Sequence, residues 1–532
     1  MSQNNYCYYY EYVESEGNEL FTTVCLPEKG GKFPTIIYRC PYQDYSVDMT
    51  DEESAKRIFD DFARGKSAKE YKWVENGYAI VFQHCRGTGK SGGEFIPYIH
   101  EREDGLNLQE WVRKQSFYNG ELYLAGSSYT STVHFATAPF ADDIKAAVFI
   151  VQDCERYNIV YRNGFFKIGL HGGWYVEQYK KKNILSKKYT IDSYKTLPLI
   201  DFSKTVFGET AEDFNELLLH PDKSDEFWDT RLGGAETRYA VKHANIPILF
   251  VAGFYDIYTG GSFDMWNSLD DETRSKSVIM VHPFDHSEGN NYGPQPIEFE
   301  DSQVKNIVSD YLINWFESAR GKSEFPLEKG KITYYELFGR GWCTDEFKTP
   351  EKQLKFTLGE GEREYVYNPY NPATFKGGLS TNFGGVQWQD EPNSRYDILS
   401  FFTPEFEEDT TIKGKIRAKL RVKSDCEDTC FYVRLSLCKE EGYYGLRDDI
   451  NQISNFAPDY KPGEEIDMEF TFDEHAFVVH KGEKIRIDVS SSAFPHYVPH
   501  TNCKGNFALQ TAAKIAHNTV ILNESNITLS VK

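Results

Sequence analysis

Short apolar runs alternate with amphipathic stretches over the first 330 residues. The runs predict strands at 21–26, 34–38, 77–82, 144–150, 246–252 and 277–281. Apolar residues recur at helical spacing in 104–112 and 306–317, and a polar helix rich in acids is predicted over 49–75. Strands that alternate with helices predict a parallel sheet covered by helices on both faces, which is the α/β class.

The pattern changes twice along the chain. Aromatic and basic clusters mixed with helical stretches predict a helical insertion over 151–243. From residue 331 onward, short alternating runs separated by turn residues predict an antiparallel β-sandwich of the jelly-roll type, with strands at 332–337, 415–422, 430–437, 485–489 and 518–522. We therefore expect an α/β domain in two parts (1–150 and 244–330), a helical cap (151–243) and a jelly roll (331–532).

Ser128 occupies a sharp turn between an apolar run and a helical pattern. Residues 122–126 read as a strand, and the helical pattern resumes at Tyr129. A Gly-x-Ser turn of this kind holds a serine hydroxyl out of the backbone and places the next N–H beside it. A serine-rich turn that caps a helix has the same local sequence, so a nucleophilic Ser128 requires a base and an orienting acid elsewhere.

Asp256 and His286 are the candidates for the acid and the base. Each follows the end of an apolar strand, as Ser128 does, and the carboxyl ends of parallel strands meet at one edge of a sheet. The order Ser, Asp, His is that of α/β-hydrolases. We expect Ser128 to attack an acyl carbon, His286 to take its proton, Asp256 to orient the imidazole and the Tyr129 N–H to bind the oxyanion.

Neighbouring residues fit these roles less well. Ser127 has no glycine two positions upstream, and Asp285 has the position of a salt-bridge partner of His286. His282 follows its strand so closely that we expect it to cap the strand or lie in the core. His220 and His243 fall in the helical insertion, where surface or helix-end positions are expected.

A glycine-rich segment after residue 84 resembles a phosphate-binding loop only in part. It contains Gly89-Lys90-Ser91, but His84 stands where the first glycine of that loop is required. We therefore exclude a nucleotide site there.

Composition narrows the classes of partner. The net charge of -22 argues against nucleic acid and anionic membrane surfaces, whose phosphates would be repelled. The start of the chain lacks a secretory signal, and no apolar stretch reaches membrane-spanning length. None of the ten cysteines forms a Cys-x-x-Cys pair, so we expect reduced thiols in a cytoplasmic protein with no metal or other cofactor.

Several motifs together resemble the bacterial cocaine-esterase and Xaa-Pro dipeptidyl-peptidase family over nearly the whole chain. They are Arg39-x-Pro41-Tyr42, Arg86-Gly-Thr-Gly-x-Ser91-x-Gly93, Gly126-x-Ser128-Tyr129, Gly253-x-Tyr255-Asp256, Pro283-x-x-His286-Ser287 and the segment 477–495 followed by Asn502. The resemblance implies an α/β-hydrolase domain with an inserted helical cap and a C-terminal jelly roll. It implies hydrolysis of esters and amides, and it makes the Tyr42 hydroxyl the second oxyanion donor beside the Tyr129 N–H.

The chain departs from the family pattern at a few positions. Ser131 stands where the family usually has glycine, Thr130 stands where the wider elbow motif has glycine, and His84 stands where the family often has an aspartate. Amino-acid-ester hydrolases of the family have acids just beyond the catalytic Asp, where this chain has Ile257, Tyr258 and Thr259. This difference favours a plain acyl esterase, although an ammonium site built from Asp153 or Glu155 in the cap stays open.

The sequence thus predicts a serine hydrolase that cleaves carboxylic esters or amides through an acyl-enzyme. Its expected partner is a small-molecule ester, amide or peptide, and a homodimer is left open. One alternative is an Xaa-Pro dipeptidyl-peptidase that releases dipeptides from peptide N-termini. A more distant alternative is an inactive hydrolase domain beside a carbohydrate-binding sandwich.

Overall fold

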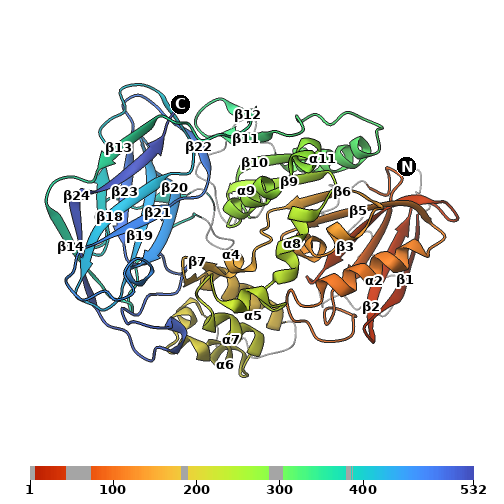
Figure 1. Cartoon of the computed structure of the whole chain (residues 1–532), viewed down its shortest axis with the longest axis horizontal. Helices are drawn as coiled ribbons and strands as arrows, with labels where there is room; N and C mark the ends of the chain where they lie inside the picture. The colour runs from red at the N-terminus through yellow and green to blue at the C-terminus, as the bar shows by residue number, and fades with distance from the viewer. Residues whose placement is uncertain (1–5, 43–72, 181–189, 287–303, 379–384, 386) are drawn as a thin grey trace.

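The computed structural model describes residues 6–42, 73–180, 190–286, 304–378, 385 and 387–532. A β-sandwich lies at one end of the molecule and a large mixed sheet at the other (Figure 1). Most of the helix predicted over 49–75 falls outside the described residues. Within these ranges, no helix is long and apolar enough to cross a membrane.

The large sheet has ten strands in the described part of the chain, in the order β1-β2-β4-β3-β5-β6-β9-β10-β11-β12. Neighbours from β4 to β11 pair in parallel, whereas β1, β2 and β12 pair antiparallel at the two edges. The strands are β1 (Cys7–Ser15), β2 (Asn18–Leu26), β3 (Phe33–Cys40), β4 (Ala79–His84), β5 (Tyr118–Ser127), β6 (Ile144–Ile150), β9 (Ile248–Tyr255), β10 (Val278–Asp285), β11 (Ile332–Glu336) and β12 (Gly341–Asp345).

Helices cover both faces of this sheet because alternate strand residues point to opposite sides. Leu124 packs into a core with α2 (Glu101–Arg113), α3 (Tyr129–Phe135), α8 (Ala235–His243) and α9 (Thr259–Ser268). Its neighbours Tyr123 and Ala125 pack on the other face, against Trp315 and Phe316 of α11 (Val304–Ala319). The short helix α10 (Asp271–Lys276) precedes β10. This is the α/β arrangement that the sequence pattern predicts.

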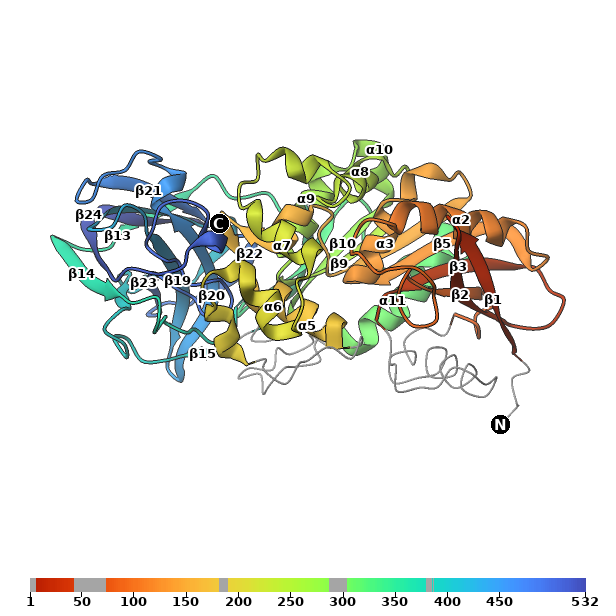
Figure 2. The same ribbon diagram turned by 90° about the horizontal axis from the view of Figure 1, so that it is seen from below.

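The chain between β6 and α8 forms the helical cap. It contains α4 (Arg156–Val160), α5 (Gly173–Lys180), α6 (Phe202–Phe207) and α7 (Glu212–Leu219), with the two-residue strands β7 (Tyr161–Arg162) and β8 (Phe165–Phe166). These helices lie between the large sheet and the sandwich (Figure 2). The cap has an aromatic core of its own, which Phe494 and Val498 of the sandwich complete. The cap is therefore packed onto the sandwich by shared apolar burial.

The named strands of the C-terminal β-sandwich all pair antiparallel. One sheet contains β13 (Gln353–Thr357), β24 (Ala516–Ser530), β18 (Arg417–Ser424) and β21 (Ile466–Thr471), with β14 (Glu362–Tyr367) also paired to β24. The other contains β15 (Trp388–Gln389), β20 (Gly442–Gln452), β19 (Cys430–Lys439), β23 (Lys484–Ser490) and β16 (Leu399–Phe402). A separate pair joins β17 (Thr410–Gly414) to β22 (His475–Val479).

One predicted strand belongs to the other sheet. We expected residues 332–337 to begin the sandwich, but β11 pairs in parallel with β10 and extends the large sheet. All five residues of β11 are buried, which is typical of a strand covered on both faces, and α11 supplies the crossover that a parallel neighbour requires. The large sheet therefore continues past residue 330, to Asp345 at the end of β12.

Candidate active site

The turn at Ser128 has the backbone of a nucleophile elbow. Ser128 has φ 54° and ψ -132°, between the end of β5 and the start of α3. A positive φ is costly for a non-glycine residue and persists only where the surroundings enforce it. Gly126 makes the turn feasible, because a Cβ there would lie 2.0 Å from the Thr130 carbonyl oxygen. The turn thus presents the Ser128 side chain at the carboxyl edge of the sheet.

Thr130 and Ser131 close the elbow with side-chain hydrogen bonds, at positions where the wider elbow motif and the family, respectively, usually have glycine. The Thr130 hydroxyl donates to the Ser127 carbonyl, and the Ser127 N–H donates to the same hydroxyl, both at 2.6 Å. The Ser131 hydroxyl donates to the Gly126 carbonyl at 2.7 Å and accepts from the Ile150 N–H at 3.2 Å. Both side chains are buried, so the two departures from the pattern are built into the helix–sheet contact.

Ser128, His286 and Asp256 lie in one chain of hydrogen bonds. The Nε2 atom of His286 is 2.9 Å from the Ser128 Oγ, and its Nδ1 atom is 2.7 Å from the Asp256 Oδ2. Asp256 directly follows β9 and His286 directly follows β10, so two adjacent parallel strands deliver them to the same edge. The buried Asp256 also accepts the Tyr258 N–H at 2.6 Å, which holds its carboxylate in place.

Tyr42 lies next to Ser128, just beyond the end of β3. Its hydroxyl oxygen accepts a hydrogen bond from the Trp174 indole Nε1 at 3.2 Å. Burial raises the pKa of Tyr42 above its usual range, and hydrogen bonds with Trp174, Ser128 and the Tyr129 backbone offset this only in part. The phenol is therefore protonated at neutral pH and can donate a hydrogen bond beside Ser128.

The side chain of Tyr129 is anchored behind the elbow. Its hydroxyl donates to the Glu101 Oε1 at 2.9 Å and accepts the Tyr98 N–H at 2.8 Å. Glu101 in turn pairs with the fully buried Arg39 at 2.9 Å. The sequence analysis did not identify Glu101; its position at the start of an amphipathic helix gave no sign that it holds the residue after the nucleophile.

An aromatic wall borders these residues. Its buried members are Cys85, Tyr98, Tyr129, Val133, Ile159, Ile257 and Tyr258, and the partly buried Tyr42, Phe95, Leu170 and Trp174 pack against them. The Tyr258 ring meets the His286 imidazole edge-on at 5.3 Å. Trp174 belongs to α5 in the cap, and sequence reasoning missed it because nothing in the cap pattern ties it to the sheet edge.

A polar cavity of about 330 Å³ lies where the cap, the start of α9 and the sandwich meet, with Ile257 in its wall. Asp153, one of the two cap acids considered for an ammonium, lines this cavity, and burial raises its pKa to about 7. Its two oxygens accept the Glu155 N–H at 2.8 Å and the Asn158 amide at 3.1 Å. Glu155, the other acid, instead pairs with Arg238 at 2.9 Å.

The other histidines considered in the sequence have different surroundings from His286. His282 is inside β10, stacked on Phe284. His220 contacts Glu216 and Asp225 in the cap. His84 ends β4, buried beside aromatic rings, and burial lowers its pKa to about 3.

Other candidate residues end secondary-structure elements: Ser127 ends β5, His243 ends α8 and Asp285 ends β10. No disulfide joins the ten cysteines, all of which are described. Across the described residues, no three His, Cys, Asp or Glu side chains gather so that they could hold a metal ion.

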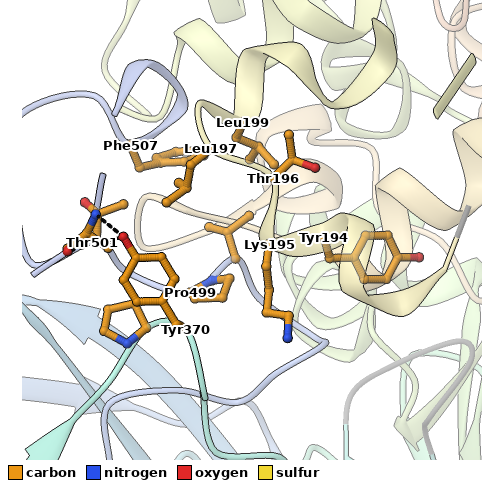
Figure 3. A pocket seen from close by; sticks show the side chains of 12 residues that line it. Tyr194, Lys195, Thr196, Leu197, Leu199, Tyr370, Pro499, Thr501 and Phe507 are labelled. Carbon is orange, nitrogen blue, oxygen red and sulfur yellow. Dashed lines mark hydrogen bonds between the residues drawn. The ribbon is translucent and has the colours of Figure 1, made fainter. Parts of the chain in front are cut away.

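A second hollow lies between the cap and the sandwich, and Ser128, Asp256 and His286 are not among its lining residues (Figure 3). Tyr194, Lys195, Tyr370 and Phe507 are among its lining residues, and its volume is about 30 Å³. That space suits one or two water molecules and is too small for a substrate.

Known proteins resemble this chain over most of its length. The sequence model of the X-Pro dipeptidyl-peptidase (S15 family) matches residues 16–288, and that of the X-Pro dipeptidyl-peptidase C-terminal non-catalytic domain matches residues 308–526. The cocaine esterase of Rhodococcus sp. (strain MB1 Bresler) is 22% identical, over 93% of this chain and 92% of its own.

Solved structures share the fold at low sequence identity. An aminopeptidase from the marine sediment archaeon Thaumarchaeota archaeon has a TM-score of 0.82 at 18% identity, over 99% of this chain and 96% of its own. An alpha-amino acid ester hydrolase has a TM-score of 0.81 at 18% identity, over 99% and 97%. These likenesses confirm the α/β-hydrolase fold followed by a β-sandwich. The first family model spans the elbow and both following strand ends, so the chain belongs to the X-Pro dipeptidyl-peptidase (S15) family and is a serine hydrolase.

Proposed function

We propose that this protein hydrolyses carboxylic esters through an acyl-enzyme formed on Ser128. The observation that carries the proposal is the pair of hydrogen bonds that links Asp256 to His286 and His286 to Ser128, at 2.7 and 2.9 Å. Ser128 sits in a strained turn, as the nucleophile of an α/β-hydrolase does.

In the first half-reaction, the Ser128 Oγ attacks the ester carbonyl carbon while His286 Nε2 accepts the hydroxyl proton. Asp256 keeps the other ring proton on Nδ1 and stabilises the imidazolium that forms. When the tetrahedral intermediate collapses, His286 gives its proton to the departing alkoxide and the acyl group stays on Ser128. Water then attacks the acyl-enzyme by the same route, with His286 as its base.

The oxyanion is bound by two donors in this mechanism: the backbone N–H of Tyr129 and the hydroxyl of Tyr42. The raised pKa of Tyr42 keeps the phenol protonated, so that it can donate to the developing negative charge. The anchoring of the Tyr129 ring on Glu101 holds the following turn of helix in place and with it the direction of its N–H.

The surroundings favour an ester with an apolar acyl or leaving group. Ile257 and Tyr258 follow Asp256, and the aromatic wall extends from them to Trp174. Burial raises the pKa of Asp153 to about 7, so this carboxyl group is only partly charged at neutral pH and is a weak partner for a substrate ammonium. The similarity to a protein named cocaine esterase points in the same direction.

A dipeptidyl-peptidase activity is the second candidate, because the polar cavity beside Ile257 contains further acids, among them Asp264 and Asp473. It also contains Arg162, which pairs with Asp473 at 2.9 Å, and Lys167, so its charge is mixed rather than anionic. A peptide amine would meet cations as well as carboxylates there.

Comparison of kcat/KM for p-nitrophenyl butyrate and glycyl-prolyl-p-nitroanilide tests the substrate class. We expect the ester to be the better substrate by at least about 10²-fold, after correction for the uncatalysed rates, since the described residues offer no dedicated ammonium pocket that would add binding energy to the peptide. Preference for the peptide would replace the esterase proposal with the peptidase.

A further inference from the structure

One side chain of the cap contacts both of the residues that would supply the oxyanion donors. Trp174 of α5 donates its indole N–H to the Tyr42 hydroxyl at 3.2 Å. The same indole stacks on the Tyr129 ring, with centroids 5.8 Å apart and planes 18° from parallel. Trp174 is only partly buried and belongs to the aromatic wall. The inserted cap therefore reaches the site where the oxyanion would form.

The hydrogen-bond donors around the Tyr42 hydroxyl restrict the direction of its proton. An indole N–H and a backbone N–H can only donate, whereas a tyrosine hydroxyl donates once and accepts up to twice. The Trp174 indole N–H takes one acceptor position of the Tyr42 oxygen. The Tyr42 proton therefore points away from the indole, and the Ser128 side chain is among the groups next to this hydroxyl.

We propose that Trp174 is a positioning residue that, through its indole N–H, fixes the Tyr42 hydroxyl with its proton aimed at the oxyanion site. The inference rests on the proposed oxyanion role of Tyr42. When substrate binds, the indole keeps its hydrogen bond to the phenol oxygen. Without the indole, the hydroxyl would have to be oriented during the reaction, and a preorganised donor is worth more than one that must reorient.

The test is a double-mutant cycle on p-nitrophenyl butyrate hydrolysis with Trp174→Phe, Tyr42→Phe and the double variant. Phenylalanine keeps an aromatic ring against Tyr129 but removes the N–H. We expect Trp174→Phe to lower kcat about tenfold, the size of one hydrogen bond. We expect Tyr42→Phe to lower it about 10²-fold. In the Tyr42→Phe background, Trp174→Phe should change kcat less than twofold, because its target hydroxyl is gone.

Phe95→Leu is the matched control for packing. The Phe95 ring lies 6.2 Å from Trp174 and 6.0 Å from Tyr129, and it has no polar atom. Phe95→Leu should change kcat by the same factor in the wild-type and in the Tyr42→Phe background. Replacement of Trp174 by benzothienylalanine, in which sulfur stands for the indole N–H, removes the donor with almost no change of shape and should reproduce the loss caused by Trp174→Phe.

The outcomes separate the inference from the mechanism on which it rests. An equal loss from Trp174→Phe in both backgrounds, or a benzothienylalanine enzyme at the wild-type rate, overturns the positioning role and leaves the oxyanion role of Tyr42 intact. A Tyr42→Phe enzyme at the wild-type rate overturns both. Phenylboronic acid, which forms a tetrahedral adduct with a reactive serine, supplies a binding readout: its Kd should rise about tenfold in Trp174→Phe and stay unchanged by that substitution in the Tyr42→Phe background.

Discussion

His286 Nε2 lies 2.9 Å from the Ser128 Oγ, although the two residues are 158 positions apart in the chain. The contact exists because β5 and β10 end at the same edge of the large sheet, with β6 and β9 between them. The side chain of Asp256 reaches the same point from the end of β9 and holds the far side of the imidazole.

Ser128→Ala should abolish ester hydrolysis. Removal of the nucleophile leaves only substrate binding and the oxyanion donors, so we expect kcat for p-nitrophenyl butyrate to fall by at least about 10⁴-fold. Ser127→Ala is the matched control, because it keeps the backbone groups that bind Thr130 and should retain activity within a few-fold. Substantial hydrolysis by the Ser128→Ala enzyme would remove Ser128 from the mechanism.

Asp256→Asn should lower kcat by about 10⁴-fold with little change in folding, because an amide of the same shape favours the wrong imidazole tautomer. The measurement is kcat for the aryl ester beside a circular-dichroism spectrum. Asp271→Asn, at a fully exposed acid of α10, serves as the control and should match the wild type. A loss smaller than about tenfold in Asp256→Asn would mean that another group orients His286.

Gly126→Ala should distort the elbow. The added methyl group would lie 2.0 Å from the Thr130 carbonyl oxygen, so the strand and helix must separate and Ser128 must move. Since a shift of about 1 Å in a reacting group costs about 10²-fold, we expect at least that loss in kcat, together with a lower Tm. Gly92→Ala is the control, because a methyl group there would meet its nearest atom at 3.4 Å. An active, stable Gly126→Ala enzyme would contradict the packing account.

Acid should destabilise the fold through buried neutral histidines, of which His282 is the cleanest case. Burial lowers its pKa to about 3, and neither ring nitrogen has a hydrogen-bond partner among the described residues. Below pH 6.5 this imidazole is protonated in the unfolded chain but stays neutral in the folded chain. Its contribution to the free energy of unfolding is therefore fully present above pH 6.5 and is lost as the pH falls toward 3. Each pH unit in this range lowers the free energy of unfolding by up to about 1.4 kcal/mol.

His282→Phe should keep the contacts with Phe284 and Trp342 and remove this proton linkage. Between pH 6.5 and 4 the variant should therefore lose up to about 3 kcal/mol less than the wild type in the free energy of unfolding, measured by urea denaturation. Parallel pH profiles for His282→Phe and the wild type would show that His282 is not buried as neutral imidazole.

Local pattern in the sequence predicted most of the strands and the residues at their ends. Alternating and continuous apolar runs distinguish strands from helices because the two structures repeat every 2 and every 3.6 residues. The order of Ser128, Asp256 and His286, each after its own run, was enough to predict that they meet. The same reasoning placed residues 332–337 in the wrong sheet, because an apolar run indicates a strand and carries no information about its neighbour.

The sequence by itself therefore determined the class of fold, the family and the candidates for the reacting groups, since these depend on periodicity and on short motifs. Tertiary structure decided what those groups touch. The indole of Trp174 meets Tyr42, Glu101 accepts the hydrogen bond of the Tyr129 hydroxyl, and Ser131, where a glycine was expected, accepts the N–H of Ile150 in β6. Each of these contacts joins separate elements whose spacing and orientation arise from packing of the whole chain, and for this reason no stretch of sequence encodes them alone.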